Sequence, residues 1–192
     1  MKKYEFTGET KEIDLYGKKI TLHRIKAVIE FGLIKAGEVG GWIEKESNLS
    51  HDNKSWVWGN AEVWGNAEVC DDAKVWGNAE VCDDAKVWGN AKVWGNAEVW
   101  GNAEVWGNAE VYRMDHILVI GPAGSRNDFT TFYHDKDNEI TVKCGCFLGK
   151  IDKFLEKVAQ THKDNKYAVV YRTAVELAKL QIDLSEENEA NE

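Results

Sequence analysis

Long apolar runs are absent from this sequence of 192 residues. No stretch approaches the roughly 18 consecutive apolar residues that a membrane-spanning helix needs, so we expect no membrane partner. The N-terminal stretch MKKYEFTGETKEID lacks the apolar core of a secretion signal. Cysteine is also scarce: the chain has four. Their spacing does not indicate a disulfide framework. These absences predict a protein of a reducing cytoplasm.

Basic residues are outnumbered, since 24 Lys and Arg face 33 Asp and Glu and the net charge is -9. Residues 57–116 hold most of this excess, with four basic and eleven acidic side chains. Such a segment repels phosphates, so we expect no nucleic-acid partner. A basic protein surface could bind it, although a solvated charged face is the commoner reason for such a composition.

What the sequence has in abundance is a six-residue repeat, as in VWGNAEVWGNAEV from Val57. Valine recurs at every sixth position up to Val111, and alanine does so from Ala61 to Ala109. A six-residue step turns a helix by ~240°, which would scatter the valines around its axis, so a helix is excluded. An extended chain fits, because alanine and the next valine share one face and Gly-Asn or Asp-Asp forms a turn. Each unit is therefore one short strand and one corner.

The unit V-W-G-N-A-E resembles the bacterial hexapeptide-repeat family, which has an aliphatic residue first and a small residue fifth. The resemblance implies a mainly β protein: a left-handed parallel β-helix with three hexads per coil and about four coils. It also implies a trimer, and acyltransferase activity with a histidine as general base at a subunit interface. The match departs from the family at the second position, which is tryptophan or cysteine here and is usually small or acidic there.

A coil of three hexads would place the second-position residues in outward columns. The tryptophans of these columns are Trp58, Trp76 and Trp94, then Trp64 and Trp100, then Trp88 and Trp106, with Cys82 and Cys70 completing the last two columns. We predict that Val81 packs between Val63 and Val99 and that Trp76 stacks between its two column neighbours. The alternative is a two-sided solenoid with two hexads per coil, suggested by identical blocks at 64–75 and 76–87. That solenoid would place Cys70 over Cys82.

The repeats divide the chain into segments: an N-terminal β cap at 1–42, the β-helix at 43–117, a small α+β domain at 118–184 and an acidic disordered tail at 185–192. The cap is predicted as a hairpin turning at residues 16–18. Gly-Gly-Trp-Ile at 40–43 resembles the N-terminal module of bacterial and phage hexapeptide proteins named as transferases. A small excursion is expected at 50–54. The α+β domain is predicted as a strand, a hairpin turning through 135–138 and two helices.

Candidate catalytic residues are few. His51 in the excursion and His116 at the last corner are the candidate general bases, if the protein is a transferase. Neither lies in a long loop, and an ordinary surface histidine is the commoner case. His134 is predicted on the opposite face of its hairpin from Cys144, which argues against a metal site there. We therefore expect no metal and no cofactor.

The segment GPAGSRND at 121–128 can hold an anion through backbone amides and one guanidinium, although a tight strand connection is the simpler interpretation. It lacks the Lys-Ser/Thr pair of a nucleotide-binding P-loop. The ligand- or partner-binding residues predicted there and on the neighbouring hairpin are Ser125, Arg126, Asn127, Asp128, Tyr133 and Lys143.

Three functions remain. The first is a non-catalytic binding scaffold, phage or prophage encoded, that displays its C-terminal domain and its aromatic columns to a protein partner such as a host factor. The second is a hexapeptide-type acyltransferase. The third is a self-assembling structural rod. We favour the scaffold because near-identical repeats preserve a surface but leave little room for a specialised catalytic pocket.

Overall fold

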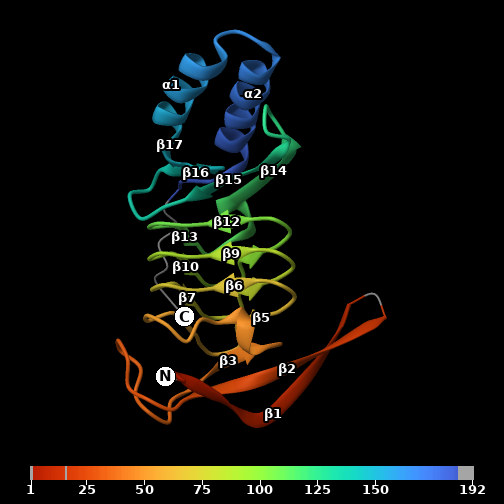
Figure 1. The fold of residues 1–192 in the computed structure, drawn as a ribbon, viewed down its shortest axis with the longest axis vertical. Coiled ribbons are helices and arrows are strands. Elements are labelled where there is room, and N and C mark those ends of the chain that lie inside the picture. The colour runs from red at the N-terminus through yellow and green to blue at the C-terminus, as the bar shows by residue number, and fades with distance from the viewer. Residues whose placement is uncertain (1, 16, 186–192) are drawn as a thin grey trace.

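The computed structural model describes residues 2–15 and 17–185, so the predicted tail lies outside the described residues except for Ser185. A parallel β-solenoid of about four turns stands between an N-terminal hairpin and a C-terminal α+β domain (Figure 1). Within the described ranges, neither helix is long and apolar enough to cross a membrane.

The solenoid is built from short strands that each end in a valine. Its ten two-residue strands are β4 Trp56–Val57, β5 Glu62–Val63, β6 Glu68–Val69, β7 Lys74–Val75, β8 Glu80–Val81, β9 Lys86–Val87, β10 Lys92–Val93, β11 Glu98–Val99, β12 Glu104–Val105 and β13 Glu110–Val111. All ten valines are at most 1% exposed, as are the alanines that precede them from Ala61 onward. The two apolar positions of each hexad therefore fill the solenoid interior, and the residue between them points outward.

The strands stack into three parallel sheets, with a register of three hexads between paired strands. Val81 pairs with Val63 below it and Val99 above it, as predicted. The other two faces are formed by β4, β7, β10 and β13, and by β6, β9 and β12. Val75 lies on a different face from Val63, so the coil of two hexads is wrong.

The backbone conformation of the corners explains why glycine holds most corner positions and aspartate holds only Asp71 and Asp83. Gly77 has a φ of +72°, a region that residues with a Cβ seldom occupy. Asp71 and Asp83 adopt the same region at +56° and +58°. Their carboxylates accept hydrogen bonds from the backbone N–H groups of Gly89 and Gly101, each at 3.1 Å. Aspartate thus replaces glycine where its side chain can bind the next coil.

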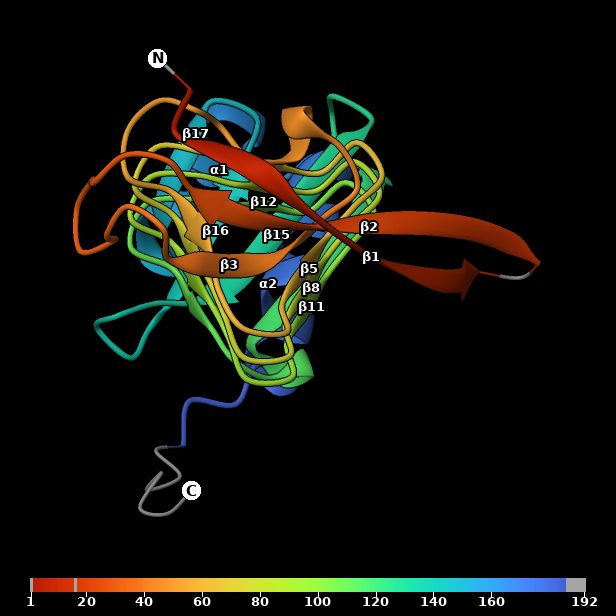
Figure 2. The same ribbon diagram turned by 90° about the horizontal axis from the view of Figure 1, so that it is seen from below.

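The N-terminal hairpin consists of β1 Tyr4–Leu15 and β2 Lys18–Ala27, and it extends beyond the solenoid (Figure 2). It is longer than the sequence pattern indicated. A register shift between Phe6 and Thr10, with Gly8 at a φ of +93°, interrupts the alternation in β1. Strand β3 Val39–Ile43 then joins the solenoid, with Ile43 pairing with Val63.

The excursion follows the short 3₁₀ helix η1 Glu46–Asn48. Leu49 forms a bridge with Val69, and Val57 pairs with Val75 in the same neighbouring coil. The chain from Leu49 to Val57 is therefore longer than the single hexad from Val69 to Val75 that lies beside it. The excursion accommodates this extra length at the corner without changing the register of the strands that follow.

The C-terminal domain is a four-stranded antiparallel sheet with two helices. After the 3₁₀ helix η2 Met114–His116, its elements are β14 Ile117–Ala123, β15 Asp128–His134, β16 Ile140–Cys144, β17 Phe147–Lys150, α1 Ile151–His162 and α2 Lys166–Gln181. The helices pack over one side of the sheet and the solenoid lies at the other (Figure 1). Two details differ from expectation: β17 was not predicted, and His134 pairs directly with Ile140, so the opposite-face assignment of His134 was wrong.

Candidate binding sites

The two candidate catalytic histidines lie at opposite ends of the solenoid. His51 packs at the N-terminal end, with its ring stacked on Tyr4 at 4.3 Å between centroids. Its Nδ1 accepts a hydrogen bond from the backbone N–H of Lys3 at 3.2 Å. Burial lowers the pKa of His51. This imidazole fastens the N-terminal strand to the excursion.

His116 lies where the last coil meets the C-terminal domain, and it is fully buried. Its ring contacts those of Tyr112 and His134, with centroids 4.0 and 4.7 Å away. Neither ring nitrogen has a hydrogen-bond partner among the described residues. Burial, assisted by the neighbouring His134, lowers the pKa of His116 to about 4. A general base must reach the proton that it removes, so this position does not suit one.

The aromatic columns are only partly continuous. Trp76 stacks on Trp94 with centroids 4.9 Å apart, and Trp94 stacks on Tyr112 at 4.7 Å. Trp88 stacks on Trp106 at 4.9 Å in a second column. Trp58 does not continue the first column, because its indole N–H donates to Glu38 at 3.2 Å.

The column of Trp64, Cys82 and Trp100 is largely covered by the N-terminal hairpin. Ile20 and Leu22 pack against Trp64 and Cys82, which are 6% and 8% exposed. Trp100, one coil further along, is 57% exposed. The hairpin therefore removes part of the aromatic surface that the repeats predict to be accessible.

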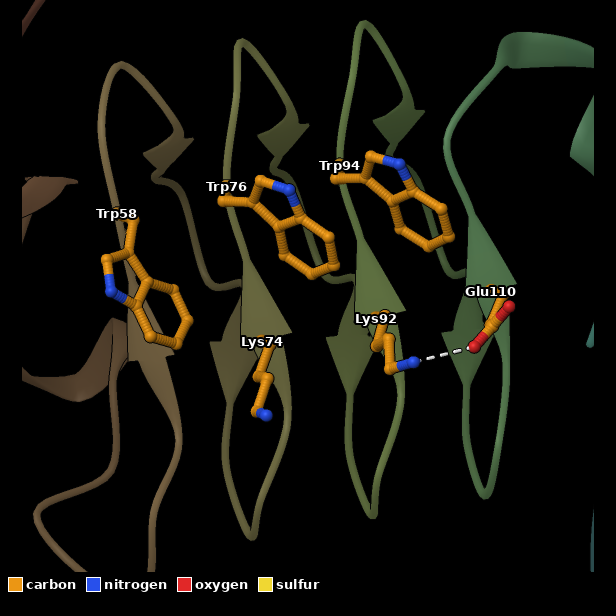
Figure 3. Close-up of a pocket in the computed structure, with 6 residues that line it drawn as sticks. All are labelled: Trp58, Lys74, Trp76, Lys92, Trp94 and Glu110. Carbon is orange, nitrogen blue, oxygen red and sulfur yellow. Dashed lines mark hydrogen bonds and ion pairs between the residues drawn. The ribbon is translucent and has the colours of Figure 1, made fainter. Parts of the chain in front are cut away.

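The first column borders an open groove on the face formed by β4, β7, β10 and β13. We call it the Trp–Lys groove; its volume is about 750 Å³ and its lining is Trp58, Lys74, Trp76, Lys92, Trp94 and Glu110 (Figure 3). Tryptophans form one side and the charged residues form the other. Lys92 pairs with Glu110 at 2.7 Å.

A second groove lies where the solenoid meets the C-terminal domain. This junction groove has a volume of about 490 Å³ and is lined by Asn66, Glu68, Asp84, Lys86, Asn102, Glu104, Arg126, Asp128, Phe129, Lys143 and Gly145. It brings together three of the predicted binding residues: Arg126, Asp128 and Lys143. The Arg126 guanidinium lies 3.9 Å from Asp128 and packs on Gly145, where an added Cβ would be 2.8 Å away.

The other predicted binding residues have different environments. Ser125 lies toward the helices, where its backbone N–H donates to the Tyr171 hydroxyl at 3.2 Å. Asn127 adopts a φ of +51° in the turn. Tyr133 is fully buried and donates its hydroxyl to the backbone oxygen of Trp106 at 3.0 Å. These three do not line the junction groove.

The junction itself is held by buried polar contacts. Lys143 is 6% exposed at its side chain and pairs with Glu104 at 2.8 Å. The backbone N–H of Glu104 donates to the Thr131 hydroxyl at 3.0 Å. Together with the hydroxyl bond of Tyr133, these contacts attach strands β15 and β16 to the last coil.

Sequence reasoning missed Glu38, Lys74 and the solenoid residues of the junction groove as possible site residues. The alternating column Glu68, Lys86 and Glu104 follows from the three-hexad register, but its continuation by Lys143 depends on the docking of the terminal sheet. Among the described residues, no group of three or more His, Cys, Asp or Glu side chains is placed to hold a metal ion.

No protein-family model matches this chain, and no curated protein matches it either. The likeness to hexapeptide transferases stays a prediction from the repeat.

Proposed function

We propose that this protein is a non-catalytic binding scaffold, in which the solenoid presents the C-terminal domain to a protein partner. The observation that carries the proposal is the ion pair of the buried Lys143 with the partly exposed Glu104, supported by the hydrogen bonds of Thr131 and Tyr133. Buried polar contacts of this kind fix the orientation of two elements, because breaking them leaves desolvated groups without partners. A domain held in this way offers the partner a preformed surface.

The junction groove is the proposed docking site. It combines the exposed guanidinium of Arg126 with the carboxylates of Asp128 and of the Glu68–Glu104 column. A polar partner surface that carries both signs of charge would complement it. The acidic excess of the repeats adds attraction for a partner of basic net charge.

We also propose the left-handed coil sense of the hexapeptide family, which the short hexad strands and the positive-φ corners support. The transferase alternative has less support, because His51 and His116 are packed at opposite ends of the solenoid. Trimer formation, phage origin and a cytoplasmic location stay predictions of the sequence.

The test compares partner capture by three versions of the purified protein. Arg126→Ala removes a junction-groove cation, whereas Arg172→Ala removes an exposed cation of α2 that pairs with Asp164 at 3.1 Å. We expect partner capture to fall for Arg126→Ala by about tenfold, since a lost charge-assisted contact is of that size, and to persist for Arg172→Ala. Equal capture by all three proteins would remove the junction groove as the docking site. Saturable binding of acyl-coenzyme A that His51→Ala or His116→Ala abolishes would favour the transferase.

A further inference from the structure

The aromatic column of the Trp–Lys groove is interrupted at one level. The rings of Trp76 and Trp94 are parallel within 2°, and Trp94 has Tyr112 on its other face. Trp58 occupies the next position of the column, but its ring is turned away from this arrangement (Figure 3). Glu38 accounts for the difference, because it accepts the indole N–H of Trp58. Among the described residues, no ring therefore stacks on the other face of Trp76.

On the charged side of the groove, the lysine of the same coil lacks a carboxylate partner among the described residues. Lys92 is neutralised by Glu110 in the adjacent strand, with 2.7 Å between their charged atoms (Figure 3). Lys74 has no carboxylate partner within the part of the chain that the structure describes. Its neighbours across the sheet are Trp56, which is fully buried, and Lys92. The positive charge at Lys74 is therefore uncompensated by any of its neighbours along the sheet.

The free ring face and the free ammonium group belong to one strand and its corner. Lys74 lies in β7 and Trp76 follows two residues later, so both side chains leave the same face of the sheet. Residues two apart on a strand are separated by ~6.6 Å, about the length of a bicyclic aromatic ring with one attached acid group.

We propose that the space between Trp58 and Trp76 is a binding site for a small planar aromatic anion. Its ring stacks on the free face of Trp76, where an offset arrangement of π systems is favourable. Its carboxylate or phosphate pairs with the Lys74 ammonium group. A cationic ligand is disfavoured because Lys74 and Lys92 lie side by side. This site is independent of the junction groove and of the proposed scaffold function.

A comparison of adjacent coils explains why the groove has such a site at Trp76 and Lys74 and not at Trp94 and Lys92. At the next level the protein itself supplies both partners, since Tyr112 covers Trp94 and Glu110 neutralises Lys92. The site opens only where Glu38 removes Trp58 from the column. Glu38 is a positioning residue in this account, because it acts through Trp58 and not on the ligand.

The test is a calorimetric and NMR titration of the full chain with 2-naphthoate. We expect saturable one-to-one binding, and about tenfold weaker binding by Lys74→Gln because a charge-assisted contact is lost. The matched control is Lys92→Gln, the equivalent lysine one coil away, for which we expect less than about twofold change. Far-ultraviolet circular dichroism verifies that both variants keep the wild-type fold.

Two further probes separate the contributions of ring and charge. Cyclohexanecarboxylate lacks the planar ring and 2-naphthamide lacks the charge, so both should bind at least about tenfold more weakly than 2-naphthoate. Titration with 2-naphthyl phosphate shows which acid group the site prefers, and tighter binding than 2-naphthoate would assign phosphate to it. Absence of saturable binding by both 2-naphthoate and 2-naphthyl phosphate, or an equal loss in Lys74→Gln and Lys92→Gln, would overturn the proposal.

Discussion

Lys143 in the terminal sheet forms an ion pair with Glu104 in the last coil, with 2.8 Å between Nζ and Oε2. The Lys143 ammonium group also lies 4.1 Å from the ring centroid of Trp106. The lysine side chain is almost completely buried, while the Glu104 side chain keeps a third of its surface exposed. This relationship joins the repeats to the domain that they are proposed to present.

Loss of this pair should weaken the junction. We expect Lys143→Met to lower the free energy of unfolding by about 1–3 kcal/mol, because Glu104 would stay partly desolvated without its cation. The matched control is Lys92→Met, whose pair with Glu110 is more exposed and should contribute less than about 1 kcal/mol. Urea unfolding of the three proteins measures both changes. An equal effect of the two substitutions would show that burial does not distinguish these pairs.

Whole coils should be removable. Deletion of residues 76–93 removes three hexads, which is one repeat of the register, and rejoins Val75 to Trp94 without changing which face each strand occupies. We expect a folded protein whose hairpin and terminal domain keep their relative orientation, since a solenoid repeat contacts only its neighbours. Deletion of 76–81 is the control, because it moves every later strand to another face. Thermal unfolding measures the stability of both proteins. If the protein that lacks residues 76–81 unfolds cooperatively and is no less stable than the protein that lacks residues 76–93, the three-sided register is contradicted.

The repeats could be recognised from sequence because their structure is local and periodic. Valine and alanine positions fix which residues face inward, and the coil of three hexads then determines the pairing of Val63 with Val81. The turned ring of Trp58 could not be found in this way, because it depends on Glu38, which precedes the repeats. Identical hexads therefore do not imply identical side-chain environments.

The terminal domain was less predictable because its pattern is not repeated. Strand β17 has four residues, FLGK, and its Gly149 weakens the signal of a strand. Of the predicted anion-binding segment, Arg126 and Asp128 reach the junction groove, whereas the backbone of Ser125 binds Tyr171 in the second helix. That difference depends on how the helices pack on the sheet, which residue spacing does not reveal.

His116 should make stability depend on pH. Its folded-state pKa of about 4 lies below the ordinary value of 6.5, so its contribution is fully present above pH 6.5 and is lost as the pH falls toward 4. Besides burial, His134 and Arg113 lower this pKa, whereas Asp115 and the nearby backbone oxygen of Glu110 raise it. The free energy of unfolding of His116→Phe should therefore fall less between pH 6.5 and pH 4 than that of the wild type. The difference between the two falls should be about 3 kcal/mol at most.

Denaturant unfolding of the wild type and of His116→Phe between pH 7.5 and pH 4 measures this difference. The range begins about one pH unit above the unfolded-state pKa, so that it includes the pH at which the contribution is complete. At pH 7 the variant should be as stable as the wild type or more so, because neither ring nitrogen has a hydrogen-bond partner among the described residues. If the free energy of unfolding depends on pH in the same way in both proteins, His116 is not the cause of the loss of stability.

The cysteines should differ in reactivity. Burial raises the pKa of Cys70 and of Cys82 to about 12, so little thiolate forms near neutral pH. Cys146 is exposed and should react first with a thiol reagent such as iodoacetamide. Mass spectrometry of the native protein after brief labelling identifies the modified residue. Modification of Cys82 as fast as Cys146 would show that the hairpin does not protect the column of Trp64.

The central claim is that the solenoid and the terminal domain behave as one rigid body, joined by the contacts of Glu104 with Thr131 and Lys143. Residual dipolar couplings of the backbone amides in weakly aligned solution measure this most directly. The account predicts that one alignment tensor fits the strands of the solenoid and the β14–β17 sheet together. Two different tensors, with a smaller alignment for the terminal sheet, would contradict it and remove the basis for a scaffold that presents this domain in a fixed orientation.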